Sequence, residues 1–245
     1  MKHLGEALRA NRYPGRLVVL CRTHDGVLTA AYALTGRSEA SRARRLDGAV
    51  AGELAVVPVG AQDSDALRHY VAACVAGPWT VYGNGEQVAE VAARLTGGQS
   101  PAEALHGLEY EPDPPIFTPR ITVVVERADG KAWLGAARRP ENGRESTDTT
   151  VTALGALPVG HGVLLSTYES DGLQVATARR HLDVLVGAGD ADQLLEEVWQ
   201  VLDHEYRVAA TAFAPQDGVK GQVRHAADDG PSKPGHVVST VTTVT

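Results

Sequence analysis

The sequence predicts an α+β domain in which antiparallel sheets carry helices on their outer faces. Apolar, β-branched stretches come in pairs joined by short turns of glycine, proline and aspartate, which is the pattern of β-hairpins. Helical periodicity follows these hairpins and does not alternate with single strands, so a parallel sheet of βαβ units is not expected. We expect one domain over residues 1–215. Residues 216–245, rich in Gly, Asp, Ser, Lys and Pro, are expected to form a disordered tail.

The first part of the chain is expected to form strands and two hairpins. The expected strands cover residues 17–21, 27–34, 53–59, 69–75 and 79–82. His24-Asp25-Gly26 joins the first two, and Gly77-Pro78 joins the last two. Residues 86–95 have apolar side chains at i, i+3, i+4 and i+7, which predicts a one-sided helix that ends at Gly97-Gly98. Ser100-Pro101-Ala102-Glu103 is a capping box and predicts a second helix.

The second part is expected to add four strands and one helix. The expected strands cover residues 121–126, 132–137, 163–168 and 208–213. Asp190 is expected to cap a helix whose apolar residues between Leu194 and Leu202 share one face. Residues 138–150 are polar without periodicity and are expected to form a loop. Residues 237–244 have strand propensity but no evident partner.

Composition argues against several classes of protein. Acids outnumber Lys plus Arg by 30 to 23, and this net charge of −7 is unlike that of a general nucleic-acid binder. No apolar run reaches the length of a membrane span, and residues 1–6 lack the apolar region of a signal peptide, so we expect a cytoplasmic protein. Cys21 and Cys74 lie in apolar runs, as buried thiols do, and the histidines lack ligand spacing, so no metal site is expected.

Residues 110–121 contain four prolines, two acidic residues, two aromatic residues and one arginine. A strand of β-branched residues follows directly. Because proline fixes φ and keeps the preceding residue out of the helical region, we expect a stiff extended connector. It would hold Glu111 and Arg120 at a set place beside a sheet. The alternative is an ordinary surface loop leading into the strand.

Arginines and serines alternate in residues 36–45, which include Arg37, Ser38 and Arg42. Guanidinium groups match phosphate and carboxylate geometry, and serine hydroxyls add donors, so this segment has the composition of a phosphate pocket. The alternative is a solvated basic loop. Arg16 adds a guanidinium at the start of the first strand, although Pro14-Gly15 before it is an ordinary turn sequence.

Two further residues could contact a ligand. Asn84 lies between two glycines at a junction of strand and helix, where its amide could face a ligand, or where the sequence could simply turn. Tyr70 alternates with apolar residues in its strand and, taken alone, would be a core residue.

Taken in order, these pieces resemble the archaeal-type IMP cyclohydrolases. The matching segments are Tyr13–Arg16, Gly36–Arg44, Ala55–Val59, Tyr70, Asn84-Gly85, Tyr110–Asp113, Thr118–Ile121 and Ser166–Glu169. The resemblance spans most of residues 11–213. It implies a four-layer αββα sandwich, similar to N-terminal-nucleophile hydrolases but without a processed N-terminal nucleophile. It also implies that the enzyme closes 5-formamidoimidazole-4-carboxamide ribonucleotide to IMP with loss of water, using neither metal nor organic cofactor.

The resemblance also implies roles for single residues. Arg42, Tyr70 and Glu111 are placed at the reacting centre, with Glu111 suited to proton transfer and Tyr70 to donation toward the developing oxyanion. Arg42 could hold that oxyanion or Glu111. The residues implied in substrate binding are Arg16, Arg37, Ser38, Asn84 and Arg120.

The chain departs from the family pattern in three places. Val88-Ala89 replaces an expected Thr-Asp, Asn11-Arg12 replaces an expected Asn-Pro, and the tail has no counterpart. A related enzyme that closes another formamido-carboxamide nucleotide in specialised metabolism therefore remains an alternative. A non-catalytic purine-nucleotide-binding protein is another, but binding alone requires neither Tyr70 nor Glu111. The expected partner is a small purine nucleotide, not nucleic acid or membrane, and a homo-oligomer is left open.

Overall fold

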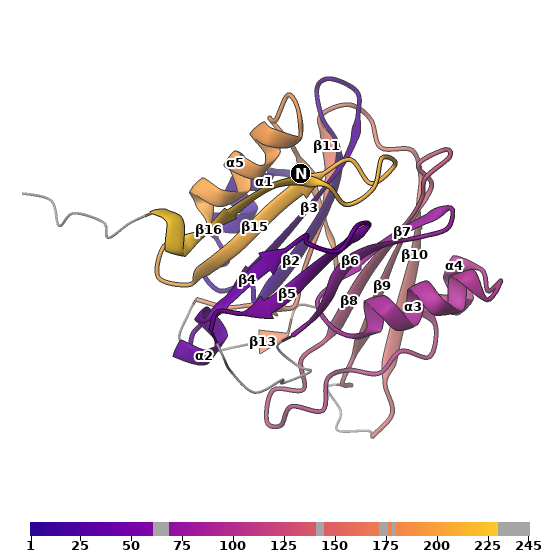
Figure 1. Ribbon diagram of the computed structural model, residues 1–245, viewed down its shortest axis with the longest axis horizontal. Helices are drawn as coiled ribbons and strands as arrows, with labels where there is room; N and C mark the ends of the chain where they lie inside the picture. The colour runs from indigo at the N-terminus through magenta and orange to yellow at the C-terminus, as the bar shows by residue number, and fades with distance from the viewer. Residues whose placement is uncertain (61–68, 141–144, 172–175, 178–179, 230–245) are drawn as a thin grey trace, which may run out of the picture.

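Two seven-stranded sheets pack face to face, and helices cover their outer faces (Figure 1). The structure is a computed structural model that describes residues 1–60, 69–140, 145–171, 176–177 and 180–229. Neighbouring strands run antiparallel except β1 (Lys2–His3) and β14 (Leu182–Leu185), which pair in parallel. The predicted α+β class with antiparallel sheets is thus confirmed.

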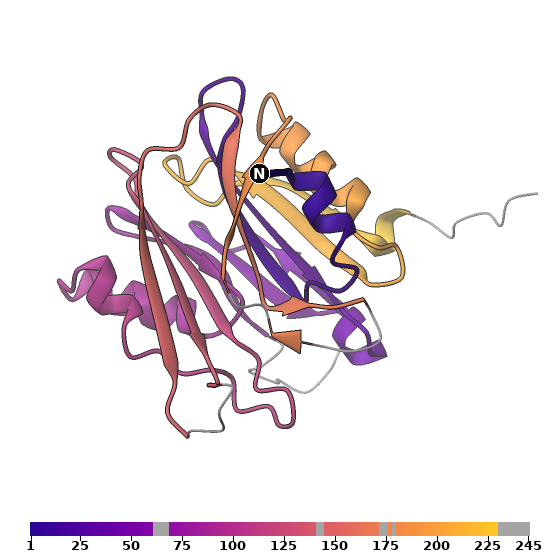
Figure 2. The same ribbon diagram turned by 180° about the vertical axis from the view of Figure 1, so that it is seen from behind.

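The first sheet has the order β1-β14-β11-β2-β3-β15-β16. Its longer strands are β2 (Arg16–Arg22), β3 (Leu28–Thr35), β11 (His161–Ser166), β15 (Arg207–Phe213) and β16 (Gly221–His225). Helices α1 (Leu4–Arg9) and α5 (Ala191–Val201) cover its outer face, as the view from behind shows (Figure 2). Asp190 caps α5 as predicted, because its Oδ1 accepts from the main-chain N–H of Gln193 at 2.8 Å.

The second sheet has the order β10-β9-β8-β7-β6-β5-β4. Its strands are β4 (Arg44–Asp47), β5 (Glu53–Pro58), β6 (Tyr70–Ala76), β7 (Trp79–Gly83), β8 (Arg120–Glu126), β9 (Ala132–Arg138) and β10 (Asp148–Leu154). Helices α3 (Gln87–Thr96) and α4 (Pro101–Leu105) cover its outer face. The short elements α2 (Glu39–Arg42), β12 (Tyr168–Glu169), β13 (Ala176–Thr177) and the 3-10 turn η1 (Ala226–Asp229) complete the fold.

The largest core lies between the two sheets. Successive side chains of a strand point to opposite faces, so every second residue enters this core. Val18 and Leu20 of β2 enter it together with Ala72 of β6 and Val123 of β8. Polar residues that continue this alternation at the strand ends therefore lie between the sheets.

Two expectations about irregular segments were wrong. Residues 138–150 are not all loop, because β10 begins at Asp148 and pairs with β9. Nor does the fold end at residue 215, because β16 pairs with β15 (Figure 1). Both strands are polar because they lie at sheet edges, where one side of the strand is solvated.

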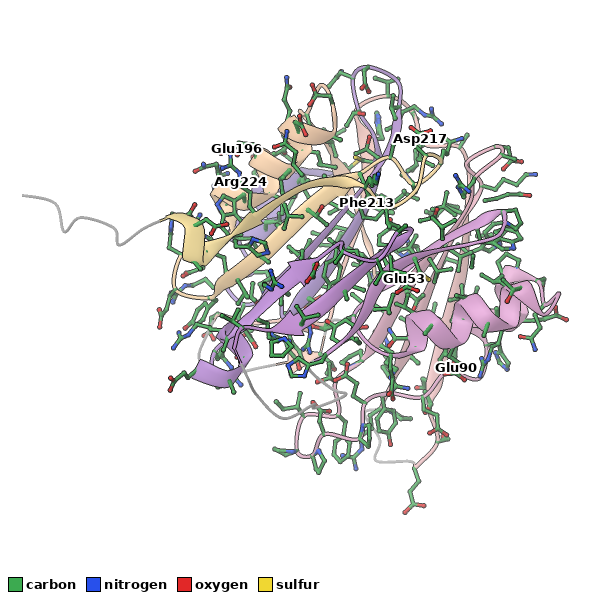
Figure 3. The ribbon with its side chains drawn as sticks, in the orientation of Figure 1. Glu53, Glu90, Glu196, Phe213, Asp217 and Arg224 are labelled. Atoms are coloured by element: carbon green, nitrogen blue, oxygen red, sulfur yellow. The ribbon has the colours of Figure 1, made fainter. Side chains whose placement is uncertain are left out.

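The C-terminal strand is also fixed by side chains. Arg224 of β16 and Glu196 of α5 form an ion pair at 2.8 Å, and Figure 3 shows the two residues side by side. The expected strand propensity at residues 237–244 lies outside the described residues. In the described part of the chain, the helices are too short or too polar to cross a membrane.

Candidate active site

Polar side chains from both sheets meet at one end of the sandwich. Arg16 is the first residue of β2 and lies opposite Leu34, near the end of β3. In the facing sheet, Tyr70 is the first residue of β6 and lies opposite Val56 of β5. Arg16, Tyr32, Arg44 and Tyr70 all continue the alternation that faces the inter-sheet core, so their side chains converge there.

Tyr70 joins the two sheets through its hydroxyl. The hydroxyl oxygens of Tyr70 and Tyr32 are 2.7 Å apart, and Arg16 Nε donates to the Tyr70 oxygen at 3.4 Å. Tyr32 is fully buried, so its hydroxyl hydrogen needs an acceptor, and Tyr70 provides one. With Tyr32 as donor, the Tyr70 hydrogen is left to donate to a third group. Tyr70 is thus a buried residue of the inter-sheet core, and its role as a donor at the reacting centre stays a prediction.

Glu111 is a buried carboxyl group that lies near enough to Arg16 to feel its charge. Only 3% of the residue is exposed, and its Oε1 accepts from Asn84 Nδ2 at 3.3 Å. Burial raises the pKa of Glu111 to about 7, although the positive charges of Arg16 and Arg120 act in the opposite direction. A carboxyl group with this pKa can both accept and return a proton near neutral pH.

The segment that carries Glu111 folds back on itself, so the expected extended connector was wrong. The main-chain N–H of Glu111 donates to the Thr118 carbonyl at 2.8 Å. Both carboxylate oxygens of Asp113 accept from Thr118, from its main-chain N–H and from its hydroxyl, each at 2.6 Å. The Tyr168 hydroxyl lies 2.5 Å from the Thr118 hydroxyl and completes the contacts. Asp113 overrides the extended preference of the prolines because its acceptors close the turn.

Asn84 fixes both the loop and the carboxyl group. It is fully buried, and its Nδ2 also donates to the Pro119 carbonyl at 2.9 Å. Its Oδ1 accepts from the Ile121 N–H at 2.6 Å and from Gln87 Nε2 at 3.0 Å. The amide is therefore mostly used within the protein, and its contact with a ligand stays a prediction.

Replacing Asn84 by Ala should destabilise the fold, because it leaves several buried groups unpaired. Each such group costs about 1–3 kcal/mol, so we expect the free energy of unfolding in urea to fall by more than about 2 kcal/mol. Gln99→Ala is the control, because Gln99 is exposed and the change should stay within about 0.5 kcal/mol. Equal urea concentrations at the unfolding midpoints of the two variants would contradict this role of Asn84.

Arg44 was not among the predicted site residues, but it lies close to them. It is 4% exposed, and its Nε donates to the Ser41 carbonyl at 2.7 Å. Burial, together with the positive charge of Arg16, lowers the pKa of Arg44. Its alternation with Leu46 in β4, like that of Tyr32 with Leu34 in β3, is the sequence signal that could have identified both residues.

The other predicted arginines of this segment lie at the surface. The Arg37 guanidinium lies 5.0 Å from the ring centroid of Tyr13, and Ser38 caps α2. Arg42 is exposed and donates to the Glu205 carbonyl at 3.4 Å. Within the described residues, no contact joins Arg42 to Tyr70 or Glu111. Its place at the reacting centre stays a prediction.

Arg120 lies at the same end of the sandwich but on the helix side of its sheet. Its Nη2 pairs with Glu86 Oε1 at 2.7 Å. Its Nε is buried and, among the described residues, has no hydrogen-bond partner. This unpaired donor is enclosed by protein, and Arg120 is near enough to Glu111 to influence the pKa of that group.

No group of three His, Cys, Asp or Glu side chains in the described part of the chain could hold a metal ion. Comparison with protein families matches residues 13–219 to the family described as IMP cyclohydrolase-like protein. A search of curated proteins finds no match.

Proposed function

The chain belongs to the IMP cyclohydrolase-like family, and from this premise we propose that it closes 5-formamidoimidazole-4-carboxamide ribonucleotide to IMP in purine biosynthesis. The observation that supports this most is that Arg16 relates to two groups at one end of the sandwich, through a hydrogen bond to the Tyr70 hydroxyl and through the effect of its charge on Glu111. If Tyr32 donates in the hydrogen bond between the two tyrosines, Tyr70 keeps its hydroxyl hydrogen to donate, and Glu111 has a pKa of about 7. Ring closure needs such a donor and such a proton acceptor.

In the proposed reaction, the carboxamide nitrogen attacks the formyl carbon of the same molecule. Holding the two groups together supplies much of the rate, because the attack is intramolecular. The Glu111 carboxylate takes a proton from the carboxamide nitrogen as the C–N bond forms. The Tyr70 hydroxyl donates to the formyl oxygen as negative charge develops on it.

The second step is loss of water. The C–O bond to the former formyl oxygen breaks, and the formamide nitrogen loses its proton. The departing water thus carries that oxygen, one proton from the carboxamide nitrogen and one from the formamide nitrogen. Protonated Glu111 can return its proton to the leaving hydroxyl, which restores the carboxylate.

The arginines are assigned to binding and charge stabilisation. Arg16 supports the Tyr70 hydroxyl and adds positive charge beside the oxyanion. Arg37, Ser38 and Arg120 would bind the phosphate or ring. Asn84 would reach the ring or ribose, and Arg42 would join the reacting centre.

The proposal also covers the type of fold, the cellular location and the partner of the protein. The helix-covered sheets support an αββα sandwich of the N-terminal-nucleophile hydrolase kind. We assign the protein to the cytoplasm and give it a purine nucleotide as its partner. At the Val88-Ala89 departure, Val88 is buried in the core between α3 and its sheet, and Ala89 is exposed.

The test is incubation of the protein with the formamido ribonucleotide, with IMP formation followed by absorbance. We expect turnover without added metal and no loss of activity after dialysis against a chelator. Absence of turnover with tight IMP binding would favour a nucleotide-binding protein. Absence of both would favour another formamido-carboxamide substrate.

Arg37→Ala should weaken substrate binding while leaving turnover nearly unchanged. The Arg37 guanidinium is exposed beside Tyr13 and would contact the substrate equally in the ground and transition states. Steady-state kinetics should therefore show a raised KM with kcat within about twofold. Arg139→Ala is the control, because this arginine also lies over an aromatic ring, that of Phe117. A fall in kcat at unchanged KM would contradict the assignment.

A further inference from the structure

Tyr168 is a buried residue of the segment Ser166–Glu169, which fits the family pattern but supplies no group to the proposed reaction. It follows β11 in the first sheet, and β11 pairs with β2. The loop that carries Glu111, by contrast, leads into β8 of the second sheet. Tyr168 therefore has a position from which it can connect the two sheets at the end where the polar groups meet.

The main chain of Tyr168 is fixed to the first sheet. Its N–H donates to the Pro14 carbonyl at 3.2 Å, and its carbonyl accepts from Asn11 Nδ2 at 2.7 Å. The preceding residue, Thr167, exchanges two hydrogen bonds with Arg16. The Arg16 N–H donates to Thr167 Oγ1 at 3.1 Å, and the Thr167 N–H donates to the Arg16 carbonyl at 2.9 Å. The position of Tyr168 is thus tied to that of Arg16.

The ring of Tyr168 is packed as closely as its main chain. It stacks on the ring of Tyr13, with ring centroids 5.7 Å apart and an angle of 17° between the planes. It also lies against Gly15, where an added Cβ would come within 2.4 Å of the ring. Because a side chain at this position would collide with the ring, the glycine is what allows Tyr168 to lie beside the start of β2.

The hydroxyl of Tyr168 reaches the loop that carries Glu111. It lies 2.5 Å from Thr118 Oγ1, which in turn lies 2.6 Å from Asp113 Oδ2. A carboxylate can only accept, so the Thr118 hydrogen points to Asp113, and Tyr168 is the donor to Thr118. Burial raises the pKa of Tyr168 to about 12, so the hydroxyl keeps the hydrogen that it donates near neutral pH.

We propose that Tyr168 is a positioning residue, whose hydroxyl holds Thr118, and with it Glu111, at a fixed place relative to Arg16. The link continues from Thr118 to Glu111, because the Glu111 N–H donates to the Thr118 carbonyl at 2.8 Å. Tyr168 thus acts through the turn and not on the substrate. The inference rests on the proposed function, in which Glu111 transfers protons and Arg16 adds positive charge.

Loss of the Tyr168 hydroxyl should free the turn and expose Glu111 to water. The pKa of Glu111 is raised to about 7 chiefly by burial. The charged groups that also act on it are Arg16 of β2, Arg120 of β8, Asp113 of the same loop and Glu86 before α3. Exposure to water weakens the effect of burial, so the pKa of Glu111 should move from about 7 toward 4.5. A general loss of stability would not move it.

Tyr168→Phe tests the link, because it removes the hydroxyl and keeps the stacked ring. Tyr206→Phe is the matched control. Tyr206 is buried in the same aromatic cluster, with its ring centroid 5.4 Å from that of Tyr13, and its hydroxyl has no hydrogen bond within the described residues.

The first measurement is an NMR titration of the carboxyl groups of isotopically labelled glutamates, which requires no substrate. The Glu111 signal is identified by its absence in Glu111→Gln. We expect the titration midpoint of Glu111 to fall toward 4.5 in Tyr168→Phe and to stay at about 7 in Tyr206→Phe. An unchanged midpoint in Tyr168→Phe overturns the inference, whether or not the protein turns over the formamido ribonucleotide.

The second measurement is steady-state kinetics with the formamido ribonucleotide. Tyr168→Phe should lower kcat more than about tenfold with KM within about threefold, because a small displacement of a reacting group slows the reaction strongly. Thr118→Val removes the next hydroxyl of the link, so the double variant should be no slower than Thr118→Val alone. Effects that multiply, or equal kcat in Tyr168→Phe and Tyr206→Phe, overturn the inference. Absence of turnover in the wild type overturns the proposed function alone, and the titration of Glu111 still decides whether Tyr168 positions this group.

Discussion

Glu111→Gln should lower kcat by a factor of about 10²–10⁴, because it removes the group that we propose transfers protons during ring closure. The change keeps the shape of the side chain, so KM should change little. Steady-state kinetics with the formamido ribonucleotide measure both constants. Glu109→Gln is the matched control, because it makes the same chemical change on an exposed side chain two residues away. Equal activity of the two variants would remove Glu111 from the mechanism.

The same variant should be more stable than wild type in mild alkali. The folded-state pKa of Glu111 is about 7, above the ordinary value of 4.5, so folding takes up a proton between these two pH values. The contribution of Glu111 to the free energy of unfolding is therefore fully present below pH 4.5 and is lost as the pH rises through about 7. A glutamine does not ionise, so Glu111→Gln should exceed wild type at pH 8 by up to about 3 kcal/mol. Urea unfolding at pH 5 and pH 8 measures this difference.

The pH dependence of activity should follow the same ionisation of Glu111. If the Glu111 carboxylate accepts the carboxamide proton, kcat/KM should rise with pH and level off above about 7. A profile that falls through this range would assign the protonated acid to the rate-limiting step instead.

Tyr70→Phe should lower turnover about a hundredfold or more, which corresponds to about 2.7–4 kcal/mol for the loss of an oxyanion donor. The change also removes the hydrogen bond to Tyr32, so stability should fall by about 1 kcal/mol. Tyr32→Phe separates the two effects, because it breaks the same hydrogen bond and leaves the Tyr70 hydroxyl in place. We expect a similar loss of stability in Tyr32→Phe, with turnover reduced less than tenfold. Equal turnover in both variants would return Tyr70 to a structural role.

The sequence predicted most strands and helices because their patterns are local. Alternating apolar residues identified β2 and β3, and the capping residue Asp190 identified the start of α5. β16 was missed because an edge strand that is polar on its exposed side has no such pattern.

The site was harder to predict because its contacts cross the fold. The hydrogen bond between Tyr32 and Tyr70 joins residues on facing sheets, and only tertiary packing creates it. The turn that presents Glu111 depends on Asp113 accepting twice from Thr118, against the extended preference of the prolines. The resemblance to a known family gave roles to Tyr70 and Glu111. It gave none to Tyr32, which comes from an otherwise apolar part of β3, or to Arg44, although Arg44 lies in a matching segment.

Because the Tyr32–Tyr70 hydrogen bond spans the two sheets, the alignment of the sheets sets where Tyr32 and Arg16 lie against the Tyr70 hydroxyl, which we propose takes part in the reaction. A shift of one layer against the other by a fraction of an ångström would leave every side chain present and yet spoil their mutual geometry. Under the proposed mechanism, the inter-sheet core also fixes the positions of the proposed catalytic groups, so its tolerance to substitution depends on chemistry as well as on folding. A substitution in the core distant from the site should then lower turnover before it lowers stability.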